Sequence, residues 1–258
     1  MARFGEWRPL GPGWAQRPRL TPDIIGLHTM VTDLPRCDAM FRRNGYAGIH
    51  SHFGVGGAGE VWQWQDSDLR AGANLNGNHR IISVETADHG PGFASWDTRG
   101  DNVPAWTAAQ VAALAELVAA LCLAHDIPCV LIPDSLPGRR GIGYHRQGCD
   151  GSYPDGRVPG GELWSSARGK VCPGNARIAQ IPAVIARARA LLDPTPEDDM
   201  QITDRLPDLF TGVPDDSMTV GDSIAWACAH AAFARRDAAA ALATAQRIEA
   251  KLDQLAQG

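Results

Sequence analysis

Three side chains that lie far apart in the sequence are of types that bind zinc. His28 ends an apolar stretch, His145 lies in "GIGYHRQ" and Cys172 lies in "GKVCPG". Taken singly, each is the kind of residue that packs in a protein core. Together, two imidazoles and one thiolate form a ligand set suited to zinc, and three protein ligands leave a fourth position for water. The sequence therefore indicates a catalytic zinc site, at which the ion lowers the pKa of its bound water to about 7.

Two charged residues are candidates for the other roles in such a site. Lys170 stands two residues before Cys172, and residues two apart in an extended segment face the same side. Its ammonium would then stabilise an oxyanion, with a solvated surface lysine as the alternative. Glu85 ends the apolar run "IISVE", where packing explains a carboxylate poorly. We expect Glu85 to act as the proton shuttle.

Apolar runs and periodic segments indicate the elements that must position these residues. Buried strands are predicted at residues 23–31, 79–87 and 127–133, and a hairpin around "GGAG" at 51–66. Helices are predicted at 108–126, after the N-cap Thr107, and at 176–193. Strands interspersed with helices in this order indicate an α/β domain with a central sheet covered by helices. The Gly- and Pro-rich segment 134–170 is either disordered or a functional loop.

The chain divides into a catalytic domain and an appendage. We expect the domain at residues 1–192, with its core at about 20–192, and an exposed linker at 193–218 that begins with "DPTPEDDM". An alanine-rich helix follows at 219–258. Its small-residue seam is a candidate for homo-oligomerisation or wall binding, and a lone helix packed on the first domain is the alternative.

Composition excludes several classes of partner. The 258 residues are 44% hydrophobic, which is enough for a buried core, and the net charge of −5 gives a nucleic-acid role no support. No continuous apolar run approaches the roughly 18 residues of a membrane span, so we expect no membrane insertion. The first residues lack the apolar core of a signal peptide, which predicts synthesis in a cytoplasm. Six cysteines without a C-x-x-C pair argue against a disulfide framework.

With these residues in view, the chain resembles the zinc-dependent N-acetylmuramoyl-L-alanine amidases of the type-2 amidase and peptidoglycan-recognition-protein family, phage endolysins in particular. The resemblance covers about residues 20–192 and rests on "LHTMV", "SHFGVGGAGEVWQWQD", "NHRIISVE", "GYHRQ" and the most specific motif, "GKVCPG". It implies a central mixed sheet flanked by helices. It also implies roles for particular residues: zinc ligation by His28, His145 and Cys172, oxyanion stabilisation by Lys170, and acid/base chemistry by Glu85.

The resemblance further implies bacterial peptidoglycan as the partner and the amide between N-acetylmuramic acid and L-alanine as the bond that is cleaved. An endolysin of this kind collects in the host cytoplasm and then lyses the cell by degrading its wall. A non-catalytic peptidoglycan-binding module and a structural virion component are the alternatives.

The hairpin region supplies the candidates for substrate contact. Groove residues suggested by the resemblance are His52, Trp64, Asn78 and His79, with core packing as the alternative for each. One position departs from the family pattern, because many relatives carry a tyrosine where Ser51 stands here.

Overall fold

The structure is a computed structural model that describes residues 4–11, 13–43, 49–97, 102–151 and 153–192. The linker expected at 193–218 and the helix expected at 219–258 lie outside the described residues. The domain boundaries and the oligomerising helix therefore stay predictions.

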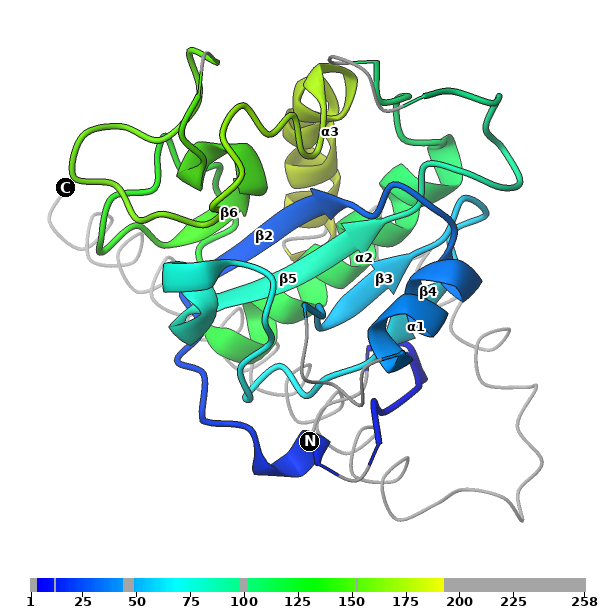
Figure 1. Ribbon diagram of the computed structural model, residues 1–258, viewed down its shortest axis with the longest axis horizontal. Coiled ribbons are helices and arrows are strands. Elements are labelled where there is room, and N and C mark those ends of the chain that lie inside the picture. The colour runs from blue at the N-terminus through cyan, green and yellow to red at the C-terminus, as the bar shows by residue number, and fades with distance from the viewer. Residues whose placement is uncertain (1–3, 12, 44–48, 98–101, 152, 193–258) are drawn as a thin grey trace, which may run out of the picture. The chain divides into compact units, whose positions relative to one another are not determined.

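The described part of the chain forms a six-stranded sheet in the order β1-β4-β3-β5-β2-β6 (Figure 1). The strands are β1 (Glu6–Trp7), β2 (Ile24–Thr29), β3 (Phe53–Val55), β4 (Val61–Gln63), β5 (Ile81–Thr86) and β6 (Gly141–Tyr144). β3 and β4 pair antiparallel as the predicted hairpin, whereas β2 pairs parallel with β5 and β6. The sheet is therefore mixed, as expected.

Helices cover both faces of this sheet. They are α1 (Leu34–Arg42), α2 (Ala108–His125) and α3 (Asn175–Leu192). The connections also contain the short 3-10 helices η1 (Trp14–Gln16), η2 (Leu75–His79) and η3 (His145–Gly148). Figure 1 shows α2 and α3 behind the sheet and α1 in front of β3 and β4. The expectation of an α/β domain with a central mixed sheet flanked by helices is confirmed.

Alternation along the strands separates a structural face from a functional face. Ile25 and Leu27 of β2 and Val84 of β5 point into the main core, where they pack with α2 and α3. His28 and Glu85 are the next residues along, so they lie on the opposite face. That second face is covered only partly by α1, which packs around Trp64.

The helix α2 starts at the predicted N-cap. The Thr107 hydroxyl accepts the Gln110 N–H at 3.0 Å, and the Gln110 amide oxygen accepts the Thr107 N–H at 3.2 Å, which completes a capping box. By length and composition α2 could cross a membrane, but half of it is buried inside this domain as a core helix.

The prediction of a strand at residues 127–133 is wrong. The segment forms only one bridge, between Leu131 and Ile142, and β6 takes the place next to β2 instead. Two prolines, Pro128 and Pro133, remove backbone donors from the segment. Val130 and Leu131 are also about 40% exposed, so the apolar run is not a buried core strand.

The prediction that His52 and Trp64 line a substrate groove is also wrong, because both are core residues. His52 is fully buried, with Nδ1 accepting the Ser83 N–H at 2.9 Å and Nε2 donating to the Leu69 carbonyl at 2.9 Å. Trp64 is also fully buried, and its indole donates to Asp38 at 2.8 Å. Neither side chain presents a surface to a ligand, so the packing alternative holds for both.

Loss of the Thr107 cap is expected to destabilise the fold. In Thr107→Ala the Gln110 N–H loses its side-chain acceptor, which predicts a fall of about 1 kcal/mol in the free energy of unfolding, measured by urea titration. The control is Thr21→Ala, because Thr21 is exposed and lies outside every helix. Equal stability of the Thr107 and Thr21 variants would contradict the capping assignment.

Burial of His52 predicts a specific pH dependence of stability. Burial lowers the pKa of His52 to about 3, so between this value and about 6.5 only the unfolded state binds the proton. The contribution of His52 to the free energy of unfolding is therefore present above about pH 6.5 and is lost as the pH falls. The loss amounts to about 1.4 kcal/mol between pH 7.5 and 5.5. Urea titrations at both pH values, with a chelator present, measure the loss.

His52→Gln is expected to remove this part of the pH dependence, whatever its effect on stability at pH 7.5. The exposed His79 supplies the matched control, His79→Gln. The same pH dependence in His52→Gln as in the unmodified chain would contradict a neutral, buried His52.

Candidate active site

The three proposed ligands converge at the carboxyl ends of the central strands. His28 is the penultimate residue of β2, and His145 opens η3 directly after β6. Because Leu27 is paired with Tyr144, the residues that follow them are neighbours, and the two imidazole centroids are 4.3 Å apart. Cys172 precedes α3, and its ligand atom and those of both histidines lie within 4.8 Å of one another.

Hydrogen bonds orient His145 and Cys172 of the cluster, and an amide oxygen lies beside His28. His145 Nε2 donates to the Trp164 carbonyl at 3.0 Å, so Nδ1 is the unprotonated nitrogen and carries a lone pair. Nδ1 is buried and has no hydrogen-bond partner among the described residues. His28 Nε2 lies beside Asn74 Oδ1 over Gly26, where a Cβ would be 3.7 and 3.9 Å from these two atoms. The Thr29 N–H donates to Cys172 Sγ at 3.3 Å.

The protonation states suit metal ligation. Burial lowers the pKa of His145 to about 3 and the pKa of His28 well below its ordinary value, and the charge of Lys170 lowers both further. Both rings are therefore neutral, as a metal requires. Burial raises the pKa of the Cys172 thiol to about 12, so a bound metal must displace its proton. An unpartnered imidazole lone pair, a second imidazole and a thiol at this spacing fit one ion.

Glu85 lies beside this cluster, as the sequence predicted. It pairs with His28 across β2 and β5, and its Oε1 is 3.8 Å from His28 Nδ1. Ser51 donates its hydroxyl to the same oxygen at 3.1 Å, while Oε2 is buried without a partner among the described residues. Burial raises the pKa of Glu85 to about 7, so the carboxyl group can take up and release a proton near neutral pH.

Lys170 stands at the wall of the same cleft and is half-buried. Its charge lowers the pKa values of His28 and His145 and opposes the rise in those of Glu85 and Cys172. The ammonium is therefore within electrostatic reach of the whole cluster, as its position next to Cys172 predicted.

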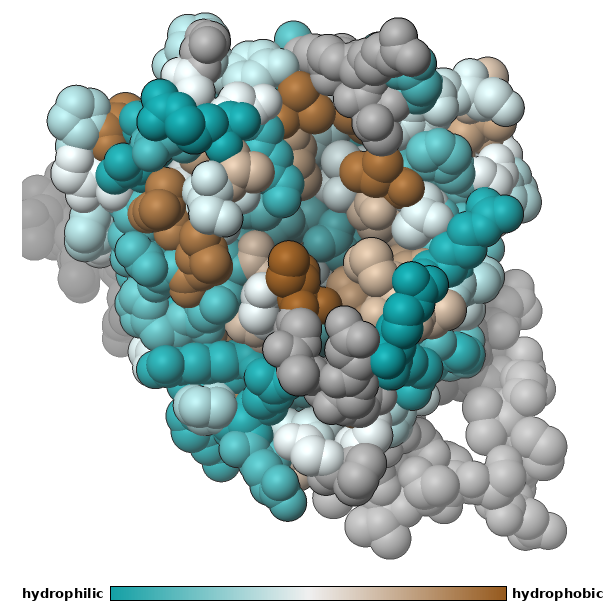
Figure 2. Space-filling view, viewed as in Figure 1, coloured by the Kyte–Doolittle hydropathy of each residue, from teal (hydrophilic) through white to brown (hydrophobic). Residues whose placement is uncertain are grey.

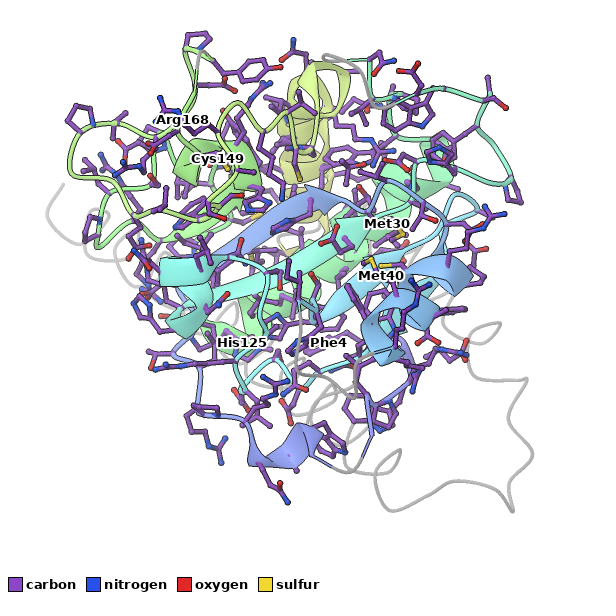
Figure 3. The ribbon with its side chains drawn as sticks, in the orientation of Figure 1. Phe4, Met30, Met40, His125, Cys149 and Arg168 are labelled. Atoms are coloured by element: carbon purple, nitrogen blue, oxygen red, sulfur yellow. The ribbon has the colours of Figure 1, made fainter. Side chains whose placement is uncertain are left out.

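A cleft of about 260 Å³ opens beside Glu85, Lys170 and Cys172. Its other walls are mostly apolar and come from Thr29, Met30, Val31, Cys37, Met40, Phe41, Ile49, Trp96, Val103 and Val171. Figure 2 shows this face of the molecule hollowed near its centre, with hydrophobic residues around the hollow. Figure 3 shows Met30 near Met40 of α1.

The structure does not bring Asn78 and His79 to the cluster. Both lie in η2, before the start of β5, whereas Glu85 lies near the end of that strand. Asn78 Oδ1 accepts the Asn74 N–H at 2.6 Å, and His79 Nδ1 is 2.7 Å from the Asn76 carbonyl. Neither side chain lines the cleft next to Glu85.

Sequence reasoning missed residues that act on the cluster. Ser51 was noted only as a departure from the family pattern, yet it holds the Glu85 carboxylate. Asn74 and Trp96 were not singled out, because neither stands next to a ligand in the sequence. The side chain of Trp96 donates to the Asp88 carbonyl at 2.8 Å, which fixes the indole at the cleft wall.

Comparison with solved structures yields the same fold. The hydrolase AmiA of Staphylococcus aureus, crystallised with its ligand, aligns with a TM-score of 0.50 at 16% identity over 74% of this chain and 85% of its own. The N-acetylmuramoyl-L-alanine amidase LysC of Clostridium intestinale aligns with a TM-score of 0.45 at 16% identity over 70% of this chain and 97% of its own. No curated protein matches the sequence.

The family comparison adds the assignment that the fold alone does not give. Residues 18–175, which include the three proposed ligands, Glu85 and Lys170, match the family described as N-acetylmuramoyl-L-alanine amidase. This match spans more than half of the chain and reaches from the segment before β2 to the first residue of α3. The chain therefore belongs to the N-acetylmuramoyl-L-alanine amidase family and is an enzyme of that activity.

Proposed function

We propose that the enzyme uses one zinc ion, held by His28, His145 and Cys172, to hydrolyse the amide between N-acetylmuramic acid and L-alanine in bacterial peptidoglycan. The observation that carries this proposal is the buried cluster of these residues with Glu85 beside it, next to a cleft that Cys172 and Glu85 line. Two imidazoles and a thiolate suit zinc, and three protein ligands leave a position open to substrate and water.

The residues of this chain divide the reaction between them. Zinc, when bound, supplies a Lewis acid that polarises the amide carbonyl and acidifies water. Glu85, with its pKa raised to about 7 by burial, takes the proton of the attacking water and returns it to the leaving amine of L-alanine. Ser51 holds Glu85 Oε1 and leaves Oε2 for this transfer. Lys170 stabilises the negative charge that develops on the carbonyl oxygen.

The walls of the cleft suit the groups that flank the scissile amide. Both the lactyl group and L-alanine carry a methyl group next to the amide, and the wall residues Met30, Met40 and Phe41 offer apolar contact. Met side chains adapt their shape to such groups without strain. Lys170 and Glu85 are the charged residues of this wall, and both are already assigned to the chemistry.

A phage endolysin is the biological role that we propose for this activity. The motifs around the five site residues are those through which the sequence resembles phage endolysins. In this role the enzyme collects in the host cytoplasm and causes lysis once it reaches the wall. A wall-binding module without activity predicts no bond cleavage, so one digestion experiment separates it from the enzyme.

Digestion of purified peptidoglycan tests the proposed activity and its metal. We expect mass spectrometry to find intact stem peptides with a free L-alanine amine, and we expect a chelator to abolish their release and added zinc to restore it. Cys172→Ser is expected to lose both the products and zinc binding. Cys122→Ser is the control, because Cys122 is equally buried but packs in the core behind the sheet.

Two results would contradict this proposal. Intact muropeptides, while the protein pellets with the wall, would favour the binding module. Full activity of Cys172→Ser in chelator would remove zinc from the mechanism.

Substitution of Glu85 tests the proton shuttle separately from the metal. Glu85→Gln keeps the shape of the side chain and cannot accept a proton, so we expect turnover to fall by about 10²–10⁴-fold with zinc affinity retained. Glu116→Gln, on the exposed side of α2, is the control. Turnover of Glu85→Gln at the level of the unmodified enzyme would place the proton transfer on another group.

A further inference from the structure

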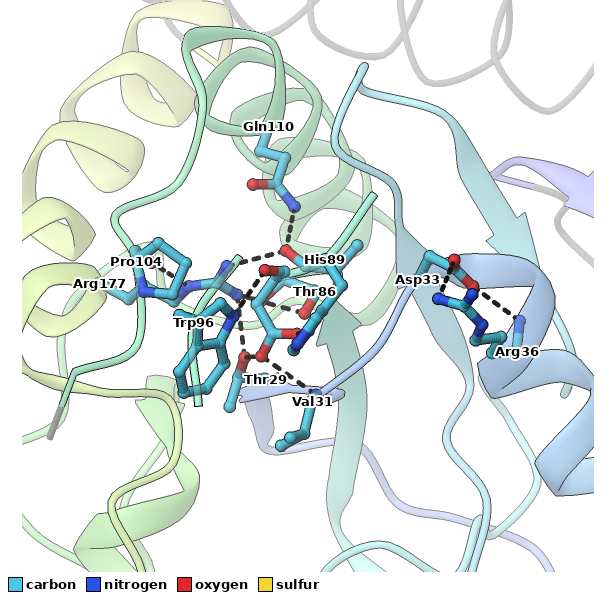
Figure 4. Close-up of polar contacts among 12 residues, drawn as sticks. Thr29, Val31, Asp33, Arg36, Thr86, His89, Trp96, Pro104, Gln110 and Arg177 are labelled. Atoms are coloured by element: carbon cyan, nitrogen blue, oxygen red, sulfur yellow. Dashed lines mark hydrogen bonds and ion pairs between the residues drawn. The ribbon is translucent and has the colours of Figure 1, made fainter. Parts of the chain in front are cut away.

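Arg177 is a fully buried arginine in the first turn of α3. Arginine is almost never fully buried unless its donors are paired. Here Nε donates to the Pro104 carbonyl at 2.8 Å, and Nη2 donates to the Ala87 carbonyl at 2.8 Å. Nη1 donates to Thr29 Oγ1 at 3.1 Å and to both oxygens of Thr86 (Figure 4).

The two threonines that Arg177 contacts are the residues that follow His28 and Glu85. The N–H of Thr29 donates to Cys172 Sγ at 3.3 Å. The hydroxyl of Thr86 donates to the carbonyl of His28. Each of these contacts ends on a proposed metal ligand. A single intervening residue therefore connects Arg177 with Cys172, through Thr29, and with His28, through Thr86.

Charge supports the same assignment. Burial lowers the pKa of Arg177 to about 10, which leaves the guanidinium charged at neutral pH. Asp88, Cys172 and Glu85 are the acidic groups whose charges oppose this fall. Asp88 is also fully buried, and its Oδ2 accepts from the Thr29 hydroxyl and, at 3.1 Å, from the Val31 N–H. Arg177 thus supplies a buried positive charge whose effect reaches the acidic groups around the cluster.

We propose that Arg177 is a positioning residue of the metal centre, which holds Thr29 and Thr86 so that the Cys172 thiolate and the His28 backbone keep the geometry for zinc. This inference rests on the proposed zinc site. A purely structural role is the alternative, in which Arg177 ties α3 and the segment around Pro104 to the sheet and leaves the affinity for zinc unchanged.

Zinc affinity and the spectrum of bound cobalt test this role independently of activity. The full chain is titrated with zinc against a chromophoric chelator, and Co²⁺ is added to the metal-free protein to record its thiolate charge-transfer band. Arg177→Met is expected to weaken zinc binding about 10–100-fold and to change the cobalt band, as replacement of residues that orient ligands does. Arg177→Lys, which keeps the charge, is expected to recover part of the affinity.

Gln110→Met is the matched control. Gln110 is fully buried and donates to the same Ala87 carbonyl at 2.9 Å, but its hydrogen bonds to described residues go to Thr107, Val55 and Ala87, not to Thr29 or Thr86. We expect it to lower the free energy of unfolding of the metal-free protein without changing zinc affinity or the cobalt band. Equal losses of zinc affinity in Arg177→Met and Gln110→Met would overturn the positioning role.

A second variant keeps the inference testable where Arg177→Met does not fold. Thr29→Val removes the hydroxyl between Arg177 and Asp88 and keeps the side-chain shape, so it is expected to weaken zinc binding and alter the cobalt band. Unchanged affinity and spectrum in Thr29→Val would overturn the proposal while the zinc site stands. Absence of zinc binding by the unmodified chain would overturn the zinc site, and the role of Arg177 with it.

Discussion

The parallel pairing of β2 with β5 and β6 is the constraint on which the site depends. This register sets His28 opposite Glu85, and it sets the residue after Leu27 beside the residue after Tyr144. A slip by one residue would turn His28 into the core behind the sheet, because neighbouring side chains on a strand face opposite ways. The packing of Ile25, Leu27 and Val84 against α2 and α3 prevents such a slip.

Burial then sets the chemistry of the residues that this register brings together. Removal from water favours the neutral form of an ionisable group, which leaves the imidazoles unprotonated and raises the pKa of Glu85 to about 7. Such a site needs charge compensation, because unpaired buried charges are costly. Lys170 supplies positive charge at the cleft wall, and Arg177 supplies a second, buried positive charge that acts on Glu85, Cys172 and Asp88.

Prediction from sequence was strongest where local pattern and packing agreed. The strands that carry His28 and Glu85, the hairpin and both long helices formed as expected, because each combines a long apolar pattern with clear end signals. Prediction was wrong at residues 127–133, where prolines and exposed side chains outweigh an apolar run. The helix α1 was not predicted, because its charged residues obscure the short apolar stripe that packs around Trp64.

The sequence by itself determined which residue types were available for chemistry: two histidines, one cysteine, one lysine and one strand-ending carboxylate, in motifs specific enough to indicate a family. It also determined the strands that carry His28 and Glu85, because the apolar pattern of a strand is local. Only the tertiary structure decided which polar residues face the cleft and which face the core. His52 and Trp64 became core residues, whereas Ser51, Asn74 and Arg177 became partners of the site. The reason is that burial and hydrogen-bond partners depend on contacts between segments far apart in sequence, which no local pattern records.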